Sequence, residues 1–172
     1  MLAAAVFPSA AEALDEGDWQ LGLAAQYAHV TAEGRAAAGL GARLDARYGA
    51  TDAWSLWGAI GSSWQPVTGG GQRPDGTVRA STGSLGVTFA LDVLRVIPFA
   101  EAGLAIVDLG GAVTHRQRAL GGELALGAEY LLDPRWSFAA VARYQYCPLR
   151  IDGDGGARPS LFTLGVRFGR SF

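Results

Sequence analysis

Hydrophobic and polar residues alternate with a period of two along most of the chain, and the last segment shows the pattern plainly. In "SLFTLGVRFGRSF" (residues 160–172), one face carries Phe162, Leu164, Val166 and Phe168. Arg167 lies on the other face. A period of two indicates a β-strand. Such a strand fits a soluble protein with the arginine in water, or a lipid-facing barrel with the arginine inside.

The same alternation recurs in seven earlier segments, which we interpret as strands. They are residues 19–28, 39–48, 54–65, 82–92, 97–107, 120–131 and 136–147. The eight segments contain about ten residues each, close to the roughly 9–11 residues that a tilted strand needs to cross a bilayer.

The connections between these segments alternate in length. Short connections are expected at 49–53, 93–96 and 132–135, and longer polar ones at about 29–38, 66–81, 108–119 and 148–159. Short turns on one rim and long loops on the other are typical of bacterial outer-membrane barrels. An even number of strands places both termini at the short-turn rim.

Almost all of the charge in the predicted strands lies on one face, together with most of the small residues. This face carries Arg43, Asp45, Arg47, Glu101, Glu123, Glu129, Arg143 and Arg167. The interior of an eight-stranded barrel is only wide enough for side chains, so small residues and paired charges fit there. The bulky apolar face then requires lipid. We therefore predict an all-β fold, an eight-stranded antiparallel up-and-down transmembrane β-barrel, closed because an open edge in hydrocarbon leaves backbone groups unpaired. A soluble, lipocalin-like ligand-binding barrel is the alternative.

Aromatic residues gather near the ends of the strands. Trp19, Tyr48, Trp54, Trp136 and Phe172 fall at the short-turn rim, and Tyr27, Trp64, Tyr144 and Tyr146 fall toward the long-loop rim. Rings of amphipathic aromatic side chains settle at headgroup depth. The pattern predicts two girdles in contact with membrane lipids.

Composition agrees with one exported domain. The chain has 172 residues, of which 17% are charged, against about 25% in soluble domains. Residues 1–13 are similar to the end of a signal peptide, with a small-x-small site at 11–13, and residues 14–172 form the predicted barrel domain. The net charge of −2 includes no basic stripe, so no nucleic-acid partner is predicted.

Over residues 18–172 the chain resembles the small outer-membrane β-barrel superfamily of the OmpA, OmpX and OmpW type. The resemblance rests on the aromatic-ended alternating strands, on "PFAEAGLAIV" at 98–107 and on the terminal Phe172. It implies a bacterial outer-membrane location and insertion by the barrel-assembly machinery, which reads a last strand that ends in phenylalanine. Phe168 and Phe172 fit this assembly signal, whereas Arg170 stands where an aromatic or apolar residue is usual.

The eight inward charges suggest two roles. Buried charge is costly unless it is paired, so a salt-bridge network that fills the lumen is the structural interpretation. The functional interpretation is a gate in a narrow pore. The long loops are expected to bind an extracellular ligand or partner, since loops on a rigid scaffold commonly carry binding.

An outer-membrane lipid-modifying enzyme, such as a lipid A deacylase, is the rival function. The chain offers only His29 and His115, and the deacylase pattern of histidine followed two residues later by serine is absent, since "HRQ" begins at His115. We predict no catalytic residue, no cofactor and no metal site, and interpret "DGDGG" at 152–156 as a polar loop. The chain has a single cysteine, Cys147, so it cannot form an intrachain disulfide. Cys147 is either a packed side chain or forms a disulfide between two chains.

Overall fold

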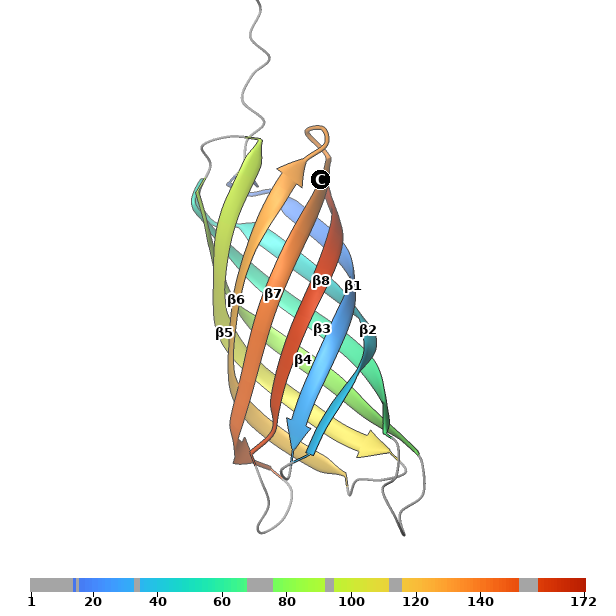
Figure 1. Cartoon of the computed structure of the whole chain (residues 1–172). Helices are drawn as coiled ribbons and strands as arrows, with labels where there is room; N and C mark the ends of the chain where they lie inside the picture. Colours follow the sequence, from blue (N-terminus) through green and yellow to red (C-terminus); the bar gives the residue numbers. More distant parts are fainter. Residues whose placement is uncertain are drawn as a thin grey trace, which may run out of the picture.

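The computed structural model describes residue 14 and residues 16–32, 35–67, 76–91, 95–111, 116–151 and 158–172. The strands are β1 (Trp19–Ala32), β2 (Arg35–Gly49), β3 (Trp54–Val67), β4 (Gly76–Ala90), β5 (Val96–Gly111), β6 (Gln117–Leu131), β7 (Trp136–Arg150) and β8 (Ser160–Ser171). Each strand pairs antiparallel with the next, and β8 pairs with β1 (Figure 1), which confirms the predicted eight-stranded barrel. No helix in these ranges is long and apolar enough to span a bilayer.

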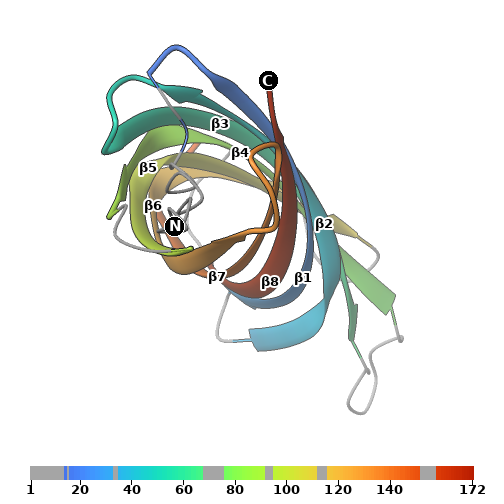
Figure 2. The ribbon, with the colours of Figure 1, turned by 90° about the horizontal axis from the view of Figure 1, so that it is seen from above.

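The barrel closes through the first and the last strand. Their pairing runs from Gln20 opposite Ser171 to Thr31 opposite Ser160. Beyond it, the amide of Phe172 donates to the carbonyl oxygen of Trp19 at 2.8 Å. Seen along its axis, the sheet forms a complete ring (Figure 2). Closure satisfies the backbone groups of both edges, as a bilayer requires.

Burial alternates along each strand as predicted: charged and small residues face the interior, and large apolar residues face outward. On β6, Glu123 is 1% exposed and the next residue, Leu124, is 63% exposed. The large side chains that face outward include Leu23, Leu40, Ile60, Leu85, Leu104 and Leu126. This surface is the reverse of a soluble barrel, whose bulky apolar residues would fill the interior.

The strands are longer than predicted at the long-loop end. They contain 12 to 16 residues, and β1 and β2 are separated only by residues 33–34 rather than by a loop at 29–38. The predicted loop at 66–81 is also wrong at its end, because β4 begins at Gly76. Many residues of these extensions are Ala, Thr, Ser or Arg. The two faces therefore do not show the difference in hydrophobicity, with the outer face apolar, by which the other strands were predicted. Backbone pairing continues there without an apolar outer face, since the outer face lies in water while the inner face is buried in the barrel.

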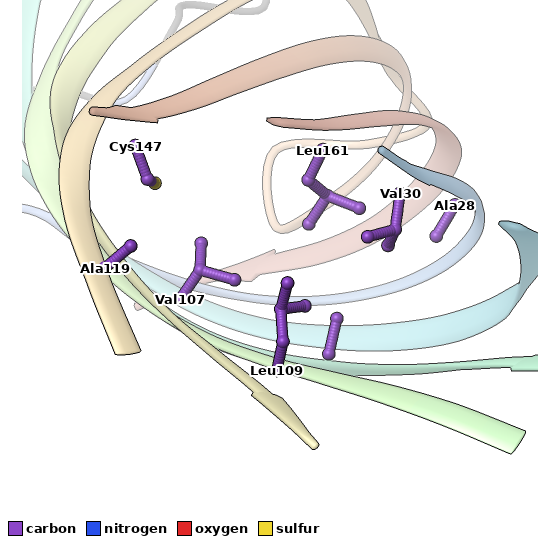
Figure 3. Packing of buried hydrophobic residues seen from close by; sticks show 8 residues of the cluster. Ala28, Val30, Val107, Leu109, Ala119, Cys147 and Leu161 are labelled. Carbon is purple, nitrogen blue, oxygen red and sulfur yellow. The ribbon is translucent and has the colours of Figure 1, made fainter. Parts of the chain in front are cut away.

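The long-loop end of the interior contains an apolar cluster, although Gln65 and Gln117 are also buried at this end. Eight buried residues form a cluster there: Ala28, Val30, Ala80, Val107, Leu109, Ala119, Cys147 and Leu161. Figure 3 shows Val30, Val107, Leu109 and Leu161 turned toward a common space. Cys147 is a free, buried cysteine, which fits the packed side chain and not the link between chains.

Candidate functional site

The eight charged residues singled out in the sequence all point into the lumen. Each is between 1% and 9% exposed. They come from β2, β5, β6, β7 and β8, and occupy the middle of the barrel and its short-turn half. Four arginines and four acids make the set neutral, which is the condition for burying so many charges.

The mid-barrel part of the set joins two arginines to two glutamates. Arg43 Nη2 lies 2.8 Å from Glu123 Oε1, and Arg143 Nε lies 2.6 Å from the same oxygen. Arg143 Nη2 also reaches Glu101 Oε2 at 2.9 Å. Arg143 therefore bridges two carboxylates.

The short-turn half continues the network without a break. Arg47 pairs with Glu101, and its other nitrogens lie 3.7 Å from Asp45 and 3.8 Å from Glu129. Arg167 lies 2.7 Å from Glu129 Oε2 and 3.5 Å from Asp45 Oδ2. All eight residues thus belong to one chain of alternating charge, which we call the lumen network.

The lumen network ties together walls that are not neighbours in the sheet. Arg43 and Arg47 extend from β2 to Glu123 on β6 and Glu101 on β5. In Figure 2, β2 lies across the ring from β5 and β6. The arrangement fills the cross-section of the barrel with charge-assisted bonds, which are stronger than bonds between neutral groups.

Several residues of this site were not singled out in the sequence. Arg43 Nη2 donates to Ser84 Oγ at 3.0 Å, Gln145 donates to Glu123, and Gln20 Nε2 donates to Glu129 Oε1 at 2.9 Å. Each occupies an inward position of the alternation, so the pattern could have identified them. They carry no charge, however, and uncharged polar residues also occur at many other inward positions.

Two aromatic rings also line the lumen network. The guanidinium carbon of Arg43 lies 5.4 Å from the Trp57 ring centre, and that of Arg47 lies 5.0 Å from the Phe99 ring centre. Glycine makes room for them: a Cβ on Gly127 would lie 2.4 Å from Phe99 Cζ, and one on Gly103 would lie 2.9 Å from Trp57 Cζ2. Small residues therefore shape the lumen around the arginines.

The nine girdle aromatics all lie on the outward face or at its ends. At the short-turn rim, three pairs of rings are in contact, with centroid distances of 5.1 Å for Trp19 and Tyr48, 5.0 Å for Trp54 and Phe89, and 4.9 Å for Trp136 and Phe168. At the long-loop rim the outward-facing rings are Tyr27, Trp64, Tyr144 and Tyr146, and at the chain end Phe172 is 61% exposed.

A second charged group lies on the outside, at the long-loop rim. Arg116 Nη2 lies 2.7 Å from Asp108 Oδ2, and Arg118 Nε lies 3.4 Å from the same atom. The hydrogen bonds from Arg116, with the charges of both arginines, hold the pKa of the Asp108 carboxyl below its usual value. The sequence pattern does not reveal this group, because it predicts a loop at 108–119.

Two further arginines stand beside girdle aromatics at the same rim. Arg79 lies with its guanidinium carbon 5.9 Å from the Trp64 ring centre and donates to Ser62 Oγ at 3.2 Å. Arg158 Nη1 donates to the hydroxyl of Tyr146 at 3.4 Å. The rim therefore presents guanidinium groups just beyond the aromatic belt.

A hydrolytic site would need a serine within hydrogen-bond reach of a histidine. His29 and Ser81 lie in β1 and β4, with β2 and β3 between them, and both are in outward positions of their strands. His115 and the "DGDGG" segment lie outside the described residues. Within the described residues, no cluster of three metal-ligating side chains is present.

Solved structures share this architecture at low sequence identity. Neisserial surface protein A has 18% identity and a TM-score of 0.69, over 91% of this chain and all of that one. Ail, the attachment invasion locus protein of Yersinia pestis, has 15% identity and a TM-score of 0.63, over 91% of this chain and 99% of that one. The outer membrane protein OprG from Pseudomonas aeruginosa has 15% identity and a TM-score of 0.62, over 92% of this chain and 97% of that one.

No curated protein sequence matches this chain. The family model for the outer membrane protein beta-barrel domain matches residues 1–169, nearly the whole sequence. With the closed barrel, the apolar outer surface and the charged lumen, this match places the protein in the bacterial outer membrane: the chain belongs to the outer membrane protein beta-barrel domain family.

Proposed function

We propose that the protein is a non-enzymatic outer-membrane barrel whose lumen is plugged and whose long-loop rim binds polyanionic ligands outside the cell. The observation that carries the proposal is the division of charge between the two ends. Among the described side chains outside the lumen network, the long-loop end carries five arginines and one acid: Arg79, Arg116, Arg118, Arg150, Arg158 and Asp108. The short-turn end carries three arginines and four acids: Arg95, Arg135, Arg170, Glu16, Asp18, Asp52 and Asp133. In this family's orientation, long loops face outward.

The lumen network supports a structural plug rather than a pore. Its eight charges are paired with one another across the barrel, and the apolar cluster around Leu109 lies between the network and the long-loop end. An ion that entered would have to break pairs that are already desolvated. Breaking one buried partner costs about 3–5 kcal/mol, which opposes passage.

The chemistry of the rim favours sulfate and phosphate esters. Arginine presents planar, bidentate donors that match these groups and remains charged at all physiological pH values. Exposed charges attract a polyanion over about 8–10 Å at moderate ionic strength. The structure of Ail was solved with the heparin analogue sucrose octasulfate. That compound is therefore a suitable probe for this chain.

The test is calorimetric titration of sucrose octasulfate into the protein in detergent micelles. We expect saturable binding that weakens as salt is raised. The double variant Arg79→Gln/Arg158→Gln should weaken binding several-fold. The matched control, Arg95→Gln/Arg135→Gln, removes the same charge from the short-turn rim and should leave binding unchanged. Equal effects of both variants, or no saturable binding, would reject the rim as a polyanion site.

Two further measurements address the competing functions. Planar-bilayer recording of the wild-type protein should show no steady ionic conductance, and a stable open channel would favour the narrow-pore role. Mass spectrometry of lipid A from cells with and without the protein should give the same species. A deacylated or otherwise modified species that depends on the protein would favour the enzyme.

A further inference from the structure

Arg170 is an outward-facing charge at the short-turn end of the barrel, where the lipid-facing surface is otherwise uncharged. Its strand partners are Trp136 on β7 and Leu21 on β1. In the described strands, no other charged side chain occupies an outward position in this half of the barrel. A charged side chain on the lipid-facing surface requires either a counter-charge or access to the membrane–water interface.

Two aromatic rings hold the Arg170 guanidinium. Its central carbon lies 5.2 Å from the Trp136 ring centre and 4.9 Å from the Phe172 ring centre. Arginine between aromatic faces is held by cation–π attraction, and its N–H donors remain directed outward from the ring faces. In the described part of the chain, no hydrogen bond or ion pair is seen for the Arg170 side chain.

Both rings are themselves fixed in place. Asp133 Oδ1 accepts hydrogen bonds from the backbone amides of Arg135 at 2.8 Å and Trp136 at 2.9 Å, which holds the turn before β7. The Trp136 ring stacks on Phe168 at an interplanar angle of 22°. The backbone N–H of Phe172 donates a hydrogen bond to the carbonyl oxygen of Trp19, which anchors the backbone that carries the ring. The site is therefore preformed in the absence of a ligand.

We propose that Arg170, Trp136 and Phe172 form a binding site for the phosphate of an anionic phospholipid in the periplasmic leaflet. The depth is that of the headgroups, because tryptophan rings settle at this level of the bilayer. The guanidinium provides bidentate donors for a phosphodiester, and the rings pack against the glycerol and the first methylenes.

The test is native mass spectrometry of the detergent-solubilised protein titrated with phosphatidylglycerol. We expect one phosphatidylglycerol to be retained preferentially over phosphatidylcholine of the same acyl length. Arg170→Gln should lower the retained fraction several-fold. Arg95→Gln, which removes an exposed arginine from the same rim, should not change it. Equal retention by wild type and Arg170→Gln would overturn the proposal.

Two additions keep the result interpretable. Arg170→Lys keeps the charge but loses the planar fork, so its retained fraction should lie between those of wild type and Arg170→Gln; it also replaces that variant if heat-modifiable migration on gels shows that Arg170→Gln does not assemble. Glycerol 3-phosphate at millimolar concentration should not displace the lipid. Displacement would assign the site to soluble phosphate esters and overturn the membrane-lipid assignment.

Discussion

Arg43 on β2 and Glu123 on β6 are joined across the lumen, with 2.8 Å between Arg43 Nη2 and Glu123 Oε1. The two strands share no backbone pairing in the barrel order, so this contact connects opposite walls. Glu123 also forms an ion pair with Arg143 and accepts a hydrogen bond from Gln145. This one carboxylate on β6 therefore binds side chains from both β2 and β7.

Glu123→Gln should destabilise the barrel strongly. The change leaves Arg43 and Arg143 without their shared anion, and an uncompensated buried charge costs about 3–5 kcal/mol. Urea-induced unfolding in detergent micelles, followed by tryptophan fluorescence, measures the free energy of unfolding. The control is Asp108→Asn, which removes a carboxylate from the exposed rim, where an ion pair contributes about 0–1 kcal/mol. A similar small effect of both variants would mean that the lumen network does not stabilise the fold.

Much of the barrel could be read from the sequence, because a period of two fixes which residues share a face. Arg43 and Glu123 were both placed inside on that basis. Their pairing could not be read, since alternation along one strand carries no information about the register and stagger of the strands across a closed barrel. The two-residue connection after Ala32 was missed for a related reason: Ala and Thr on both faces give no contrast, although backbone pairing continues.

Loss of a lumen charge should open a path for ions if the network is a plug. Arg43→Ala removes one end of the chain of charges and leaves space between Trp57 and Glu123. We expect a measurable rise in single-channel conductance in planar bilayers relative to wild type. Glu101→Ala, which frees Arg47 and Arg143 together, should give at least as large a rise. Unchanged conductance in both variants would count against the plug.

Gly127→Ala should perturb the Phe99 ring below Arg47. The new Cβ would lie 2.4 Å from Phe99 Cζ and 2.7 Å from the carbonyl oxygen of Ala140, so the ring and the strand must shift. Overpacking of this kind costs about 1–3 kcal/mol. Gly58→Ala is the matched control, because the nearest atom to its Cβ is 3.9 Å away, and it should change the unfolding free energy by less than about 0.5 kcal/mol. The same urea titration distinguishes the two.

The ion pairs of Asp108 at the long-loop rim should depend on pH. The pKa of Asp108 is lowered, chiefly by hydrogen bonds from Arg116, so its contribution to stability is present above the ordinary aspartate pKa and is lost only as pH falls through the lower folded value. An NMR titration of the Asp108 carboxyl carbon should therefore show a midpoint below that of an aspartate in a short peptide. A midpoint at or above the peptide value would show that Arg116 does not hold the carboxylate in solution.

Neutralising Asp108 should strengthen polyanion binding at the rim. The carboxylate competes with a ligand for Arg116 and Arg118, whose side chains are 65% and 43% exposed. At neutral pH, Asp108→Asn should bind sucrose octasulfate several-fold more tightly than wild type, because one negative charge is removed from the rim. Wild type should gain affinity only when pH falls through the depressed pKa of Asp108, whereas the variant should lack that step. Weaker binding by Asp108→Asn would instead mean that Asp108 is needed to orient the two arginines, and that the ligand is recognised by their fixed geometry rather than by their charge.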